Sequence, residues 1–188
     1  MRVSGEFWVP LRLQNDDQPL PEKHPLRVVF EAAGTLAAAI VLMVGMTTFL
    51  VKPVRVYGDS MLPTLRGGQR LVISVCASRF RHGDIVVVSG AGHSLPYRQV
   101  IIKRVIGLPG DVIDIDFEAN AVYRNGQALE EPYIAEPTER REDFDGPVTV
   151  KPGAVFVLGD NRNRSTDSRS ALVGLVDQRC ILGRVMFK

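Results

Sequence analysis

The sequence has few of the residues that build metal sites and disulfide frameworks. It contains two cysteines, Cys76 and Cys180, and three isolated histidines, His24, His82 and His93. Structural zinc sites need cysteine and histidine ligands clustered at short spacings. We therefore expect no metal site and no cofactor. A disulfide between the two cysteines stays open, because the distance between their sulfur atoms cannot be read from sequence.

An excess of charge of one sign is also missing. The 188 residues include 23 basic and 21 acidic ones, for a formal net charge of +2. Proteins that bind nucleic acids usually present a clustered basic face, so we expect no nucleic-acid partner. The length suits about one compact domain plus an anchor.

One long segment carries no charge at all, from Ala32 to Val51. About twenty apolar residues cross the hydrocarbon core of a bilayer as a helix, and Pro53 ends the segment. A buried core helix or a cleavable signal peptide would be shorter, and a signal peptide would have fewer residues before it. We predict an N-terminal tail (1–27), a transmembrane anchor in the lipid bilayer (28–51) and a folded domain (52–188). Basic residues on both sides of the anchor leave its orientation undecided.

The rest of the chain has the sequence pattern of a β domain. Short runs rich in Val and Ile alternate with Gly, Pro and Asp, which is typical of strands and turns. Asn125-Gly126 fits a tight hairpin turn. The strand candidates are 70–76, 84–88, 99–106, 111–116, 121–124, 127–129 and 154–158. We predict a mainly β fold of antiparallel sheets, partly closed or sandwiched, with one N-terminal transmembrane helix.

Ser60 is the first residue that could carry chemistry. It lies in the segment Gly58-Asp-Ser-Met-Leu-Pro-Thr-Leu65, just past the anchor, where glycine and proline allow an open turn. A serine in a turn more often bonds its own backbone. Ser60 therefore needs a second observation before it is read as a nucleophile.

Lys103 and Arg104 supply that observation, because they interrupt an apolar strand. Adjacent side chains on a strand point to opposite faces, so both cannot face the same water. Lys103 could still extend to solvent from an edge strand. A buried lysine is costly unless it is paired or neutral, and a neutral lysine is a base that can activate a serine. Its pKa would have to fall from ~10.4 to about 8 to supply that base near neutral pH.

A third polar segment, Gly159-Asp-Asn-Arg-Asn-Arg-Ser-Thr-Asp-Ser-Arg169, follows a strand and could be no more than a solvated loop. Together the segments resemble the bacterial type I signal (leader) peptidase family. The matching motifs are Ser-Met-x-Pro-Thr-Leu at 60–65, Gly-Asp-Ile-Val-Val at 83–87, Lys-Arg-Val-Ile-Gly-Leu-Pro-Gly-Asp at 103–111 and Gly-Asp-Asn-Arg at 159–162. The resemblance covers the anchor and essentially everything from 54 to 188.

The resemblance implies a membrane-bound serine endopeptidase that removes signal peptides from exported preproteins after small residues, in Ala-x-Ala patterns. It places the N-terminus in the cytoplasm and the catalytic domain outside it. Ser60 would be the nucleophile, Lys103 the general base, and Ser165 the hydroxyl that orients the lysine. Two supporting ion pairs are implied, Asp167 with Arg169 and Asp160 with Arg104.

The family also implies a substrate pocket. Met61, Leu65 and Ile102 would line the pocket for P1, the residue before the scissile bond. Val54, Val56 and Leu71 would lie near P3. The alternative for these apolar residues, above all for Leu71, is a place in the ordinary core. An extended peptide would reach these pockets by adding to a sheet edge.

Two features depart from larger members of the family. Gly58 stands where some of them carry a serine that completes the oxyanion hole, so the second donor is open. The stretch between Asp111 and Gly159 is short, which predicts a hairpin and loop in place of an extra β subdomain. Three other functions fit parts of the pattern, namely a self-cleaving repressor, a pilin-maturation enzyme and an inactive membrane-tethered β module. The anchor argues against the first, and intact Ser60 and Lys103 argue against the last.

Overall fold

The computed structural model describes residues 25–75, 79–90 and 100–187. Helix α1 spans Pro25–Leu50 and carries an exposed Arg27–Glu31 ion pair of 3.1 Å in its first turns. Its window Leu26–Gly45 has a mean hydropathy of 2.1 and buries none of its surface within the structure. Among the described residues it is the one helix long and apolar enough to cross a membrane. The predicted tail (1–27) lies outside the described residues, except for residues 25–27, which form the start of α1.

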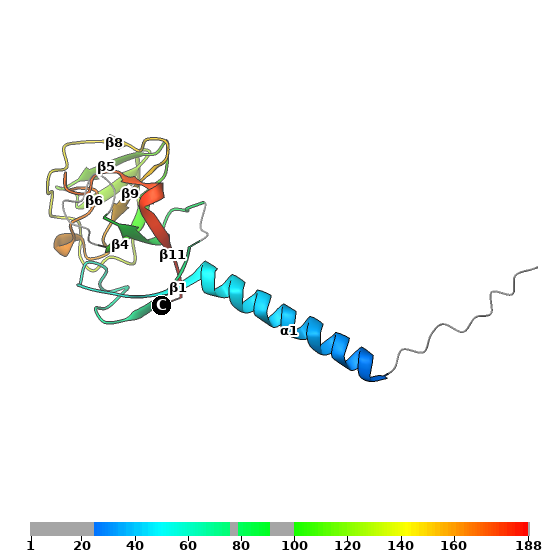
Figure 1. Ribbon diagram of the computed structural model, residues 1–188. Helices are drawn as coiled ribbons and strands as arrows, with labels where there is room; N and C mark the ends of the chain where they lie inside the picture. Colours follow the sequence, from blue (N-terminus) through cyan, green and yellow to red (C-terminus); the bar gives the residue numbers. More distant parts are fainter. Residues whose placement is uncertain (1–24, 76–78, 91–99, 188) are drawn as a thin grey trace, which may run out of the picture. The chain divides into compact units, whose positions relative to one another are not determined.

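A seven-stranded antiparallel sheet forms the main body of the β domain, in the order β1-β2-β11-β3-β4-β9-β10. Figure 1 labels its strands β1, β4, β9 and β11. Its strands are β1 (Val51–Arg55), β2 (Arg70–Ser74), β3 (Ile85–Ser89), β4 (Val100–Gly107), β9 (Ala154–Leu158), β10 (Val176–Asp177) and β11 (Ile181–Phe187). The predicted runs at 70–76, 84–88, 99–106 and 154–158 thus form β2, β3, β4 and β9. The prediction of a mainly antiparallel β fold is confirmed.

A second antiparallel sheet fills the stretch between Asp111 and Gly159, where a hairpin and loop were expected. Its order is β7-β6-β5-β8, built from β5 (Val112–Asp116), β6 (Ala121–Arg124), β7 (Gln127–Ala128) and β8 (Val148–Thr149). Asn125 and Gly126 have positive φ of 53° and 79°, the conformation of a tight hairpin turn. The expected hairpin is therefore present, but β8 returns to pair with β5 and enlarges the sheet.

Alternation along β5 explains why this second sheet packs on the first. Ile113 and Ile115 are buried, whereas Asp114 and Asp116 are exposed. The two isoleucines join a core cluster with Ile106, Phe156 and Leu158 of the main sheet. Two further apolar clusters lie elsewhere against the main sheet, one around Val87 and Ile102 and the other around Val86 and Val105. Strand β4 thus contributes a residue to each of the three apolar clusters.

Two short 3-10 helices, η1 (Arg162–Arg164) and η2 (Gln178–Cys180), complete the described elements. The segment 168–175 forms turns and bends. Cys180 is half-buried in η2. Cys76 lies outside the described residues, so the pairing of the two cysteines stays a hypothesis.

Gly107 permits the close approach of the two sheets at the end of β4. A Cβ atom added there would lie 2.8 Å from Cγ1 of Ile113 and 2.9 Å from Cγ2 of Val150. We predict that Gly107→Ala lowers the free energy of unfolding by about 1–3 kcal/mol through overpacking, measured by denaturant unfolding in detergent. Gly67→Ala is the control, since its Cβ would make an ordinary contact at 3.5 Å. Equal stability of the two variants would contradict this view of the packing.

Candidate active site

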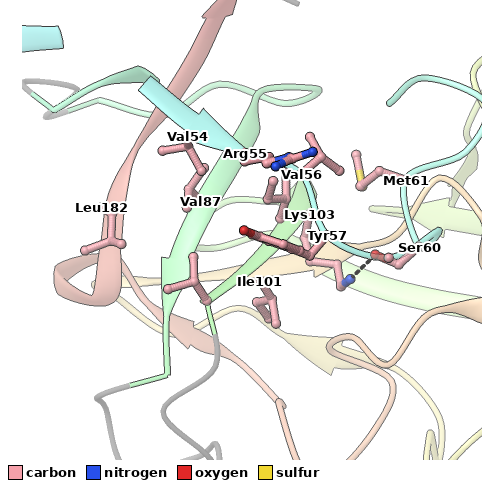
Figure 2. Close-up of a pocket in the computed structure, with 13 residues that line it drawn as sticks. Val54, Arg55, Val56, Tyr57, Ser60, Met61, Val87, Ile101, Lys103 and Leu182 are labelled. Carbon is pink, nitrogen blue, oxygen red and sulfur yellow. Dashed lines mark hydrogen bonds between the residues drawn. The ribbon is translucent and has the colours of Figure 1, made fainter. Parts of the chain in front are cut away.

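Ser60 and Lys103 meet in the structure. The Nζ atom of Lys103 donates a hydrogen bond of 2.8 Å to Oγ of Ser60 (Figure 2). Ser60 lies in a turn closed by the bond from Leu62 N to the carbonyl of Asp59, at 3.1 Å. Lys103 lies inside β4, so the turn that follows β1 presents its serine to a rigid strand.

Strand alternation separates Lys103 from its neighbour, as predicted. In β4, Lys103 is paired with Val86 of β3, and Arg104 with Leu158 of β9. Lys103 reaches Ser60, while Arg104 turns to Asp160. Both side chains are nevertheless buried, so neither extends freely into water.

Burial controls the protonation of Lys103. The residue is 3 % exposed, and desolvation lowers its pKa from the ordinary 10.5 to about 8. Nearby Asp167 and Asp160 raise the pKa, and Arg169 lowers it, but these charges do not outweigh the loss of hydration. The pKa is therefore close to the value that the sequence argument required of a serine-activating base.

The ion pair of Arg104 and Asp160 lies beside this dyad. Arg104 Nη2 and Nε contact the two carboxylate oxygens at 2.6 and 2.8 Å, and Nη1 donates to the carbonyl of Gly83 at 2.9 Å. The guanidinium also stacks 3.9 Å from the ring centre of Tyr133. These contacts hold Arg104 away from Ser60, as the resemblance implied.

Asp167 is the centre of a second buried network. It accepts from Arg169 Nε at 2.8 Å, from the backbone N–H of Gly159 at 3.0 Å and from Oγ of Ser165 at 2.7 Å. The ion pair of Asp167 with Arg169 is thus present. The implied hydrogen bond from Ser165 to Lys103 is not found in the described part of the chain. The hydroxyl donates to Asp167 and could still accept from an amine, so the role of Ser165 in orienting Lys103 stays a prediction.

Glycine at position 159 brings the polar loop against the serine turn. A Cβ there would lie 2.6 Å from the carbonyl oxygen of Ser60 and would overlap the hydroxyl of Ser165. The backbone N–H of Asn161 donates to that same carbonyl at 3.0 Å, and its side chain donates to Asp59 at 3.1 Å. The loop that carries Asp160 and Asp167 therefore fixes the backbone on which Ser60 sits.

A pocket of about 750 Å³ opens beside the dyad. Four predicted substrate residues line it, Val54, Val56, Met61 and Ile102, and Gly58 lies at its edge with a φ of 78°. Leu65 and Leu71 do not line the pocket. Both are completely buried in the apolar cluster that supports Val56 and Met61, so their expected place in the pocket wall is corrected to the core.

Several lining residues were missed from the sequence. They are Arg55, Tyr57, Val87, Val100, Ile101 and Leu182. Arg55 and Tyr57 alternate with Val54 and Val56 and could have been found from that pattern. Leu182 reaches the pocket through strand order, which no local pattern predicts.

Two strand edges border the pocket. The backbone of Val56 forms its hydrogen bonds on the β2 side. Its N–H donates to the carbonyl of Gln69, and its carbonyl accepts from the N–H of Gly68. The backbone groups of Arg55 and Tyr57 therefore face the other way, since alternate residues bond to opposite sides. On the far wall, β9 pairs with β4 only from Arg104 onward. No described strand covers that edge of 100–103, so an extended peptide can bond to both walls.

Comparison with known proteins places this geometry in a family. The model of the family described as signal peptidase, peptidase S26, matches residues 29–188. A signal peptidase I of Bacillus licheniformis is 38% identical over 170 residues, covering 85% of this chain and 87% of the relative. A probable signal peptidase I of Synechocystis sp. is 37% identical over 182 residues, covering 92% and 87%.

A crystal structure of a signal peptidase I from Enterococcus faecalis V583 is similar with a TM-score of 0.46 and 31% identity, covering 58% of this chain and 98% of that one. The match to the family model spans most of helix α1, the serine turn, β4 and the polar loop together. The chain belongs to the signal peptidase family, peptidase S26.

Proposed function

We propose that this protein is a membrane-bound signal peptidase I that cuts signal peptides from exported preproteins, with Ser60 as nucleophile and Lys103 as general base. Membership of the S26 family makes it a serine peptidase of the signal-peptidase type. The observation that carries the residue assignment is the 2.8 Å contact between Ser60 Oγ and a buried lysine amine. A serine hydroxyl needs such a base within hydrogen-bond reach.

The reaction follows from the protonation state of Lys103. The neutral amine takes the proton of Ser60 as Oγ attacks the carbonyl carbon of the scissile bond. The resulting ammonium gives that proton to the leaving amine when the C–N bond breaks, which leaves an ester on Ser60. Water then attacks the ester carbon and loses a proton to the same amine. When the C–O bond to Ser60 breaks, the ammonium returns that proton to Oγ, and the signal peptide leaves as an acid that ionises in water.

Charge that develops on the carbonyl oxygen needs donors. The backbone N–H of Ser60 bonds to no described residue, so it can donate to the oxyanion. Gly58 carries no hydroxyl, and the second donor is its own backbone N–H or a water. The side chain of Asn161 donates at 3.1 Å to the Asp59 carbonyl of the same peptide group, which keeps this N–H in place.

The two strand edges and the apolar pocket between them support peptide recognition. An extended substrate adds to an open edge through main-chain hydrogen bonds, and alternate side chains then enter the pocket. Val54, Val56, Met61 and Ile102 wall that space. Small side chains at P1 and P3 fit without displacing them, which accounts for cleavage after Ala-x-Ala patterns.

We place the membrane around helix α1. The proposed organisation keeps residues 1–27 as a cytoplasmic tail, 28–51 as the anchor and 52–188 as the catalytic domain on the extracytoplasmic side of the cell membrane. The 20-residue apolar window supports the anchor. Basic residues flank both of its ends, so the orientation comes from the function, since signal peptides are cut after export.

Loss of either dyad residue tests the chemistry. We predict that Ser60→Ala and Lys103→Met each reduce cleavage of a purified preprotein by several orders of magnitude. The double variant should be no worse than either single one, because a nucleophile and its base act as a unit. Lys151→Met, at an exposed position away from the dyad, is the control and should cleave normally. Substantial cleavage by Lys103→Met would remove the lysine from the mechanism.

The lowered pKa of Lys103 predicts how activity and stability depend on pH. Activity should rise as pH increases through about 8, where the folded amine loses its proton. The unfolded lysine binds that proton more tightly than the folded one, so the native state loses stability relative to the unfolded state at low pH. This cost is full below about 8, fades between about 8 and 10.5 and is absent above that range.

Lys103→Met removes this cost. The variant should be at least as stable as wild type at pH 7, with a gain of up to about 3 kcal/mol. The gain should shrink as pH approaches 10.5. Urea unfolding of both proteins at several pH values measures it. A variant clearly less stable than wild type at pH 7 would show that the ammonium is not penalised by burial.

Thiol labelling tests the orientation of the anchor. In a background with Cys76→Ser and Cys180→Ser, Lys151→Cys should react with a membrane-impermeant maleimide in intact spheroplasts, because the domain lies outside. Ser4→Cys should react after permeabilisation alone. The reverse pattern would place the catalytic domain in the cytoplasm.

A further inference from the structure

The segment 54–57, which borders the pocket on the β1 side, has an apolar inner face and an exposed outer face. Val56 is buried and Val54 half-buried on the inner face, whereas Arg55 is exposed and Tyr57 is 83% exposed on the outer face. All four line the pocket (Figure 2). The inner face serves the apolar pocket, which leaves a cation and an aromatic ring with no part in the proposed function.

Arg55 has no acidic partner in the described part of the chain. Its opposite residue in the pairing of β1 with β2 is Arg70, which is also exposed. Like charges directly opposite one another destabilise a strand pair. No ion pair is made by either arginine with a described residue, although other exposed arginines, such as Arg179, do pair. The sheet edge therefore carries positive charge that a ligand could neutralise.

Strand geometry determines which part of a bound peptide meets Arg55. In the proposed function, P3 lies toward Val54 and the scissile carbonyl lies at Ser60, so the peptide runs in the same direction as the segment from Val54 to Ser60. Successive side chains of an extended peptide point to opposite faces. With P1 and P3 in the pocket, the P2 side chain points outward at the level of Arg55 and Tyr57.

We propose that Arg55 is a specificity residue that favours an acidic side chain at P2, with the ring of Tyr57 packing along its methylene groups. The proposal rests on the proposed function and deepens it, because P2 is the residue between the two small ones. A neighbouring side chain on the adjacent strand is within reach of an arginine. The contact is exposed, so it should change kcat/KM by about two- to fivefold and weaken as salt screens it.

The test compares three preprotein substrates that differ at P2 alone and carry Glu, Ala or Lys there. Cleavage is measured with full-length enzyme in non-ionic detergent without anionic lipid. Wild type should cleave the Glu substrate faster than the Ala substrate, and the Lys substrate most slowly. Arg55→Glu should reverse the ratio of Glu to Lys rates, and Arg55→Lys should keep its direction. Raising the salt concentration should bring the wild-type ratio toward one.

Arg66→Glu is the matched control, since Arg66 is an exposed arginine of the same β1–β2 connection that does not line the pocket. It should keep the wild-type ratio. If Arg55→Glu slows all three substrates equally, or if Arg66→Glu shifts the ratio as strongly, Arg55 does not select P2 and the inference is wrong. Cleavage of the Ala substrate by wild type separates this outcome from failure of the proposed function, in which none of the three is cut.

Discussion

The site depends on one energetically unfavourable feature, the burial of the amine of Lys103. An ammonium removed from water must be paired or must give up its proton. Lys103 lies at 3 % exposure with the Ser60 hydroxyl as its single hydrogen-bond partner among the described residues. Burial therefore destabilises the charged form of Lys103 and lowers its pKa, so that the amine can act as a base near neutral pH. The apolar clusters around β4 maintain this environment, so the core contributes to the chemistry as well as to the fold.

The buried carboxylates nearby would work against this effect if they were alone. Asp160 and Asp167 both raise the pKa of Lys103, because a negative charge stabilises the ammonium. Each is matched by its own arginine, Arg104 or Arg169, at hydrogen-bond distance. Arg169 partly offsets their effect on Lys103, and desolvation outweighs it, so the pKa of Lys103 stays lowered to about 8.

The sequence predicted those parts of the site that depend on local pattern. The 2-residue period of a strand separates Lys103 from Arg104, and the motif around Ser60 indicates an open turn. The parts that failed depend on tertiary packing. Leu65 and Leu71 have the same apolar character as Val56 and Met61, and only the position of the neighbouring strands decides which of them are completely buried. The pairing of β8 with β5 likewise depends on a return of the chain that no local signal marks.

Ser165 ties the polar loop to the buried carboxylate of Asp167. Its hydroxyl makes no hydrogen bond with Lys103, whose one partner among the described residues is Ser60. Instead Ser165 donates to Asp167, which also accepts from the backbone of Gly159. Gly159 in turn lies too close to the Ser60 carbonyl to allow a side chain. Ser165, Asp167 and Gly159 therefore form one chain of contacts that reaches the backbone of Ser60.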